Sequence, residues 1–153
     1  MNAVDPGSSP GQALLGLLAD PSQAGAFFVD ARDREAMAEA AETLDYKVLR
    51  IDLAGCRDKA HALQLIAEAL QFPDWVGDNW DALADAINDL SWLPSNGYLL
   101  LLEHAGEWRE HAGADFGVLL DILNQAATPW AEQGIAFWAL LPLPTQEWTT
   151  LES

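Results

Sequence analysis

The sequence predicts a small α/β domain with a mostly parallel sheet of three to four strands and helices packed on it. Apolar segments of strand length alternate with segments of helical periodicity along the chain. Two of the strand segments are apolar almost without interruption, which is typical of parallel strands buried on both faces. The chain has 153 residues, half of them hydrophobic, so one domain with a packed core is expected.

The first 45 residues contain a leader and an N-terminal extension. Residues 1–11 are rich in turn-forming residues and are expected to be flexible. Residues 12–45 predict an extension that belongs to the same domain and adds a strand and a helix to the sheet edge. Its elements are a short helix at 12–19, a strand at 26–29 and a helix at 32–44.

Residues 46–142 form the predicted core of the domain. Pro73 ends one predicted helix, Pro142 and Pro144 close the last strand, and Pro129 is expected to kink or interrupt the last helix. A polar tail, residues 143–153, carries Trp148. The strands are expected at 47–53, 98–103 and 135–141, and the helices at 57–70, 79–90 and 115–132.

The charge of the chain is strongly negative and unevenly distributed. There are 24 acidic and 7 basic residues, a formal net charge of −17. Residues 60–153 hold 14 of the acids and one base, Arg109. Such a surface repels phosphate backbones, which disfavours direct nucleic-acid binding, and it attracts basic proteins. General solubility is the alternative explanation of the charge.

Several other classes of protein are disfavoured by the sequence. A single cysteine, Cys56, excludes an internal disulfide and a cysteine-cluster metal site. No signal-peptide pattern or membrane-length apolar run occurs, so a cytoplasmic location is expected. The three histidines match no catalytic triad or metal spacing, and no phosphate-binding loop is present. We therefore expect no catalytic residue, metal, cofactor, membrane partner or small-molecule substrate.

The candidate functional segment is residues 73–89. No basic residue lies between Pro73 and Trp92. The helical periodicity places four carboxylates on one side and an apolar set on the other. Like charges one turn apart repel, and the acids near the C-terminal end of a helix also oppose its dipole. A stability cost carried without nearby Lys or Arg favours a functional face. The carboxylates are Asp78, Asp81, Asp85 and Asp89, and the apolar set is Trp80, Leu83, Ala84, Ile87 and Leu90.

Three kinds of chemistry compete for this acidic face. Paired carboxylates can act in general acid/base catalysis, but that needs a cleft and a second kind of group. Asp81 and Asp85 can share a divalent metal, but the spacing lacks the pattern of a calcium loop. An exposed convex helix best suits an electrostatic plug, whose carboxylates occupy phosphate positions in a basic pocket. Trp75 in the preceding loop supports this third interpretation, because aromatic anchors are typical of interface hot spots.

The stretch Phe72-Pro-Asp-Trp-Val-Gly-Asp-Asn-Trp-Asp-Ala-Leu-Ala-Asp85 resembles the signature of the barstar family, the intracellular inhibitors of secreted bacterial ribonucleases. The family pattern is Pro, acid, aromatic, any residue, Gly, acid, Asn, apolar, Asp-Ala-Leu, and an Asp four residues after the first. Every one of these positions is filled. The order of elements over residues 47–141 is also similar to that of the family, which implies a barstar-like core.

The resemblance implies a mechanism in which the loop and the following helix plug a nuclease active site. Asp85 would replace the substrate phosphate among the basic side chains of the enzyme, and Asp81 would pair with a neighbouring base. Trp75 would take the place of a loop tyrosine that stacks on a catalytic histidine. Gly77 and Asn79 would shape the loop and offer polar contacts. The remaining predicted partner-binding residues are Val76, Asp78, Trp80 and Asp89.

The sequence departs from the family pattern at three places. An interface Trp of the family is Ala84 in this chain, and a glutamate of the last helix falls near Thr128 and Pro129. Trp92 lies two residues later than the family's next aromatic, so its contact with a partner stays open, as does that of Asp89.

We predict a non-enzymatic immunity protein that forms a 1:1 complex with a basic ribonuclease toxin. The alternatives are an immunity protein against another toxin, a hydrolase using Asp81 and Asp85, and an acidic scaffold.

Overall fold

The computed structural model describes residues 15–56 and 58–143. The predicted leader, the start of the first predicted helix and residues 144–153 of the predicted tail, with Trp148, lie outside these residues, whereas Leu143 belongs to the last strand and not to the tail. Residues 15–18 are helical. The elements that follow are η1 Pro21–Gln23, β1 Ala26–Asp30, η2 Ala31–Asp33, α2 Arg34–Thr43, β2 Lys47–Asp52, α3 Lys59–Ala69, α4 Trp80–Asp89, β3 Gly97–Glu103, α5 Gly106–His111, α6 Gly113–Glu132 and β4 Ala136–Leu143.

The four strands form one parallel sheet in the order β1-β4-β3-β2. Every residue of β4 and all but the last residue of β3 are buried. Parallel neighbours need long crossover connections, and the helical segments supply them. The α/β class predicted from the sequence is confirmed. The N-terminal strand β1 is an edge strand that pairs with β4.

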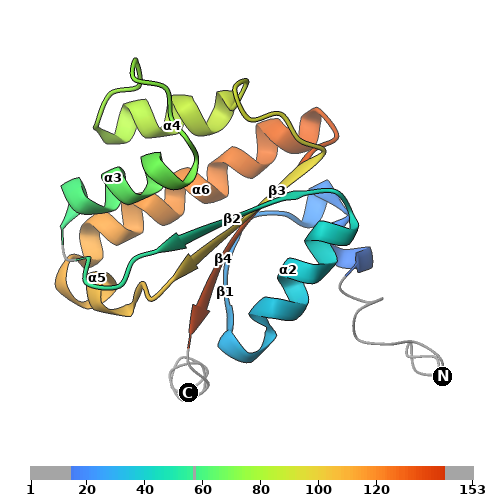
Figure 1. Ribbon diagram of the computed structural model, residues 1–153, viewed down its shortest axis with the longest axis horizontal. Helices are drawn as coiled ribbons and strands as arrows, with labels where there is room; N and C mark the ends of the chain where they lie inside the picture. The colour runs from blue at the N-terminus through green and yellow to red at the C-terminus, as the bar shows by residue number, and fades with distance from the viewer. Residues whose placement is uncertain (1–14, 57, 144–153) are drawn as a thin grey trace.

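Helices cover both faces of the sheet, with α2 on one face and α3, α4 and α6 on the other (Figure 1). Successive residues of β3 point to opposite faces. Leu99 and Leu101 therefore pack in the core under α2, whereas Tyr98, Leu100 and Leu102 pack in the larger core under α3, α4 and α6. Helix α4 packs on α6, and its other face is exposed to solvent.

The expectations that Pro129 interrupts the last helix and that Pro142 closes the last strand are wrong, whereas a kink at Pro129 stays a prediction. The helix α6 is not interrupted, because it continues through Pro129 to Glu132. Pro129 is exposed, and its missing N–H removes one hydrogen bond of the helix. Ala127 and Trp130, on either side of it, are buried and hold the helix against the core. The strand β4 continues through Pro142, where pairing with β3 has already ended, so the missing N–H has no β3 partner to lose.

Aromatic N–H and O–H groups bind the carbonyls at three helix ends. The last carbonyls of a helix have no partner within the helix, and α3 and α4 have no basic residue in their last turns. The indole N–H groups of Trp92 and Trp130 donate to Leu70 O and Ile87 O, at 3.0 and 2.9 Å. Leu18 O, at the end of helical residues 15–18, accepts from Trp138 and Tyr46 at 3.1 and 3.0 Å. Neutral tryptophan and tyrosine donors thus satisfy carbonyls at helix ends that basic side chains can also satisfy.

The short helix α5 has no counterpart among the predicted elements. Its six residues are too few to show a helical period, and it begins at a glycine, Gly106, which disfavours a helix. Packing explains it, because the fully buried Trp108 lies edge-on to Phe116 of α6 at 5.6 Å between ring centroids. Among the described residues, no helix combines the length and the apolar character needed to cross a membrane.

Candidate functional site

The candidate site begins where α3 ends. Gln71 adopts the left-handed conformation with φ 56°, and its N–H donates to Glu68 O at 3.2 Å. The N–H of Phe72 donates to Ala67 O at 2.9 Å. This pair of bonds is a Schellman motif, and Pro73 directly after it prevents the helix from resuming. The chain therefore leaves α3 in a fixed direction.

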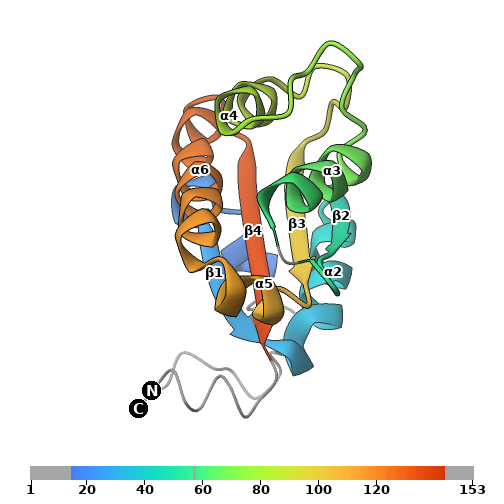
Figure 2. The ribbon, with the colours of Figure 1, turned by 90° about the vertical axis from the view of Figure 1, so that its left-hand side faces the viewer.

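The α3–α4 loop, residues 70–79, lies at one end of the molecule. Figure 2 shows it at the opposite end from the arrowheads of the parallel strands. A turn within it is closed by the N–H of Val76, which donates to Pro73 O at 3.0 Å. A side chain at Gly77 would place its Cβ 3.3 Å from the Cβ of Ala82, so the loop passes tightly over the first turn of α4. A glycine suits this close approach.

Trp75 is the most exposed large hydrophobic residue described, at 70% of its surface, and its ring is nevertheless supported. It lies edge-on to Trp92, with ring centroids 5.8 Å apart and an interplanar angle of 87°. Trp92 in turn lies edge-on to Phe72 at 5.8 Å and hydrogen-bonds Leu70 O. Edge-to-face pairs of this kind add about 0.5–1.5 kcal/mol beyond the buried area. The exposed indole is therefore held in place before any partner arrives.

Asn79 fixes the start of α4. Its backbone is extended, and its side-chain Oδ1 accepts a hydrogen bond from the N–H of Ala82 at 2.8 Å. The residue that the family resemblance expects to offer polar contacts to a partner is thus the N-cap of the helix.

Replacing Asn79 by alanine is expected to lower the free energy of unfolding by about 1 kcal/mol, because the Ala82 N–H loses its acceptor. Asn79→Asp keeps an acceptor and places a negative charge at the helix N-terminus, so it should retain the stability of the natural chain. Urea unfolding followed by circular dichroism measures both. Equal destabilisation by Asn79→Ala and Asn79→Asp would show that the cap bond contributes little.

The two faces of α4 are those that the sequence predicts. Asp81, Asp85 and Asp89, called the acidic stripe below, are exposed along α4. Asp78, which the periodicity placed with them, is also exposed, but it precedes the N-cap Asn79 and lies in the loop, so its place on the helix is corrected. On the other face Leu83 and Ile87 are buried, and Trp80 and Ala84 are half-buried. Trp80 packs against the larger core, so much of its ring serves the fold.

The acidic stripe carries its repulsion unrelieved. Within residues 15–56 and 58–143, no ion pair involves any of its three carboxylates or that of Asp78. The stripe reaches the C-terminal end of α4, where Leu90 turns into the left-handed conformation and Asp89 accepts a 3.3 Å hydrogen bond from Ser91 Oγ. Negative charge at this end opposes the helix dipole. The stripe is therefore a set of carboxylates that no basic side chain of the described residues neutralises.

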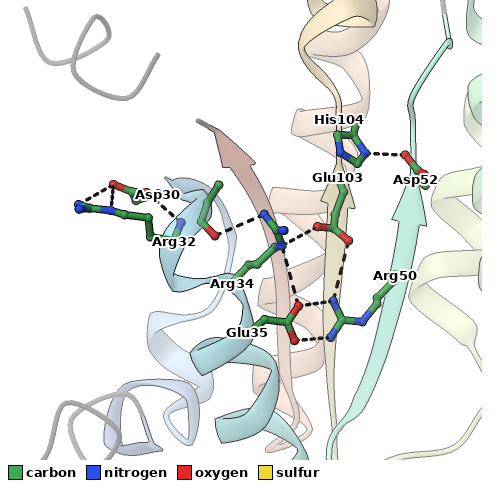
Figure 3. Close-up of polar contacts among 9 residues, drawn as sticks. Asp30, Arg32, Arg34, Glu35, Arg50, Asp52, Glu103 and His104 are labelled. Atoms are coloured by element: carbon green, nitrogen blue, oxygen red, sulfur yellow. Dashed lines mark hydrogen bonds and ion pairs between the residues drawn. The ribbon is translucent and has the colours of Figure 1, made fainter. Parts of the chain in front are cut away.

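Basic side chains are paired at the other end of the sheet (Figure 3). Arg34 Nε lies 3.0 Å from Glu103 Oε1, at the end of β3. The guanidinium of Arg50 donates two bonds of 3.2 Å to Glu35 of α2. Each of these arginines also lies within 4.0 Å of the carboxylate of the other pair, at 3.9 and 3.8 Å. This ring ties α2 to β2 and β3 and leaves its positive charges neutralised.

A second polar pair lies beside this ring. His104 Nδ1 and Asp52 Oδ1 are 2.7 Å apart at the ends of β3 and β2. The backbone N–H of Ala54, followed by the ring of His104, holds the pKa of Asp52 below its ordinary value. Within the described part of the chain, no three His, Cys, Asp or Glu side chains gather as a metal site requires.

A comparison with models of known families identifies the family of this chain. The family model described as barstar, the barnase inhibitor, matches residues 46–142, which is more than half of the chain. The chain belongs to the barstar family. The family consists of inhibitors that bind ribonucleases, which gives this chain an inhibitor or immunity type of role in general. The match includes the whole α3–α4 loop and α4.

A solved structure shares the fold at low sequence identity. It is the ORC2 protein of Aeropyrum pernix in complexes with ADPNP and ADP, with a TM-score of 0.57 and 16% identity. The alignment covers 99% of this chain and 46% of the ORC2 chain, so this chain spans less than half of that protein. At this identity the likeness concerns the fold alone. No curated protein matches the sequence.

The residues predicted to bind a partner lie on one continuous piece of the structure, the loop and α4. Trp92 is the residue whose place in the site could not be predicted, because it follows α4 by three residues and contacts Trp75 across the loop. Trp92 lies two residues later than the family's next aromatic residue, so the family pattern assigned it no role. The structure gives it a supporting place behind Trp75.

Proposed function

We propose that this chain is an immunity protein that binds a basic ribonuclease toxin 1:1 and occludes its active site with the α3–α4 loop and the acidic stripe. The observation that carries the proposal is Trp75, which is 70% exposed and held by Trp92 beside carboxylates that form no ion pair with any described residue. A rigid aromatic side chain next to charge is typical of interface hot spots. Barstar-family membership supplies the class of partner.

Inhibition needs no chemistry by the inhibitor. Asp85, in the middle of α4, takes the place of a substrate phosphate among the basic groups of the nuclease, and Asp81 pairs with a base beside them. Trp75 stacks on an aromatic or histidine ring at the mouth of the pocket. The stripe rises from a convex helix, so it enters a pocket in the partner and shuts out RNA.

The distribution of charge favours this orientation. The chain has a net charge of −17, which draws a basic partner towards it. Arg34 and Arg50 are neutralised in ion pairs at the carboxyl ends of β2 and β3, whereas the carboxylates of α4 are not neutralised within the described residues. The end of the molecule that carries α4 is therefore the one that a basic protein approaches first.

The partner differs from barnase in the shape of its surface. Ala84 is a small, half-buried residue between Asp81 and Asp85, where the family has a tryptophan. The last turns of α6 present Thr128 and Pro129 in place of a glutamate, and both are exposed. These replacements favour a nuclease with a different rim, and they also favour the second candidate, a toxin of another class with a similarly basic pocket.

The test is a binding and inhibition assay against basic ribonuclease toxins encoded beside genes for this chain, with barnase as the family reference. We expect a 1:1 complex by calorimetry and loss of RNA cleavage. The association rate should fall on the order of tenfold or more as ionic strength rises. Inhibition by a complex in which the nuclease still binds RNA at its active site would overturn the proposed occlusion. Failure to inhibit any of these nucleases would overturn the ribonuclease proposal.

A further inference from the structure

A groove of about 530 Å³ separates α3 from the loop that follows it. The wall on the α3 side consists of Ala60, Leu63, Gln64 and Ala67. These residues are spaced i, i+3, i+4 and i+7, so they form one face of the helix. Two of the four are alanine, and this leaves room between the helix and the loop. Trp75 does not line the groove, since its ring packs on Trp92 instead.

The groove combines an apolar floor with an acidic rim. Leu63 and Leu83 are buried at its base, and Val76 is half-buried in its loop wall. The carboxylates of Asp74 and Asp78 stand at its rim and are exposed. Neither forms an ion pair with another described residue.

This combination selects one kind of side chain. A long basic side chain can lay its methylene groups on an apolar floor and keep its charged head at the rim. A neutral apolar side chain would leave the two rim carboxylates without a counter-charge. An acidic side chain would be repelled by Asp74 and Asp78.

We propose that the groove between α3 and the loop receives a lysine or arginine side chain of the toxin. The inference rests on the proposed function, because it places the groove next to the stripe in the same interface. The toxin is then gripped on two sides of the loop, by Trp75 with the acidic stripe on one side and by the groove on the other. The groove makes the contact specific for a basic residue outside the catalytic pocket.

The first experiment needs no toxin. The ¹⁵N-labelled chain is titrated with Nα-acetyl-lysine N-methylamide, with its arginine analogue, and with the uncharged norleucine analogue. We expect saturable amide shifts confined to the groove, at Ala60, Gln64, Ala67, Val76 and Gly77. The norleucine analogue should bind at least about fivefold more weakly than the lysine analogue, because it lacks the exposed ion pair.

Two variants of equal charge provide the control. Gln64→Lys places an ammonium group in the groove wall, whereas Gln125→Lys adds the same charge at an exposed position of α6 that does not line the groove. Both positions are exposed and helical, and lysine is a good helix former, so both variants should fold. Gln64→Lys should abolish the localised shifts and Gln125→Lys should keep them. Equal effects of the two variants, or shifts spread along the acidic stripe, would overturn the proposal.

The toxin complex separates this proposal from the function on which it rests. Gln64→Lys should weaken the complex more than Gln125→Lys does. A complex that is lost on Asp85→Ala but unchanged by Gln64→Lys keeps the proposed function and overturns the groove. Localised lysine shifts in a chain that inhibits no ribonuclease support the groove and overturn the function alone.

Discussion

Replacing Asp85 by alanine is expected to weaken the complex with the ribonuclease by at least about 2 kcal/mol, roughly a thirtyfold rise in Kd. The family's own nuclease complex provides some of the largest known effects of this kind. Asp85 lies in the middle of the exposed stripe, so binding buries its carboxylate against basic groups of the partner. Alanine would leave those groups desolvated and without a counter-charge. Isothermal titration calorimetry measures the change in Kd.

The same substitution should affect stability in the opposite direction. Alanine is a better helix former than aspartate, and removing Asp85 relieves its repulsion with Asp81 and Asp89. The free energy of unfolding of the free chain should therefore rise by roughly 0.5 kcal/mol. A variant that binds less tightly and is at the same time more stable cannot owe its weak binding to misfolding.

Asp121→Ala is the matched control for charge. Asp121 is an exposed aspartate of α6, and its replacement changes the net charge by the same amount. It should slow association slightly at low ionic strength and leave the dissociation rate unchanged. If Asp85→Ala and Asp121→Ala weakened the complex equally, net charge alone would drive binding and the plug mechanism would be wrong.

The core of the fold and the faces of α4 could be predicted because their signals are local and long. Strands β3 and β4 are nearly unbroken apolar runs, and their burial on both faces follows from that composition. In α4 the aspartates repeat at four-residue steps opposite Leu83 and Ile87. This periodicity determined the exposed face without knowledge of any other element. The binding roles of its residues stay a prediction.

Features that depend on contacts between distant segments could not be predicted in this way. Pro142 interrupts a strand pattern in sequence, yet it is tolerated because β3 no longer pairs at that level. Helix α5 exists because Trp108 is buried beneath α6, which a six-residue segment does not reveal. The support of Trp75 by Trp92 joins residues on either side of α4. Each of these depends on where another element lies.

Trp130→Ala is expected to lower the free energy of unfolding by about 3–5 kcal/mol, the largest stability effect that we predict. Trp130 is 5% exposed, and its ring lies 5.3 Å from the ring of Tyr98. Its indole N–H also donates to Ile87 O, one of the carbonyls left without a partner at the end of α4. Urea unfolding monitored by far-ultraviolet circular dichroism measures the loss.

The variant Trp130→Phe separates the two contributions of this tryptophan. Phenylalanine retains most of the packing but leaves Ile87 O without its donor, so the expected loss is about 2 kcal/mol. Because that carbonyl belongs to α4, amide hydrogen exchange in the last turn of α4 should accelerate more than exchange in β3. Uniform acceleration in both elements would mean that the bond does not anchor α4.

Trp75→Ala completes the comparison between tryptophans. Its ring is exposed apart from the edge-on contact with Trp92, so stability should fall by about 1 kcal/mol or less. Binding of the toxin should weaken by at least about 2 kcal/mol, as for a hot-spot residue. The two tryptophans are therefore expected to act in opposite ways. Trp130 stabilises the fold without contacting the partner, whereas Trp75 contacts the partner and contributes little to stability. A chain in which Trp75→Ala left Kd unchanged would bind its partner elsewhere.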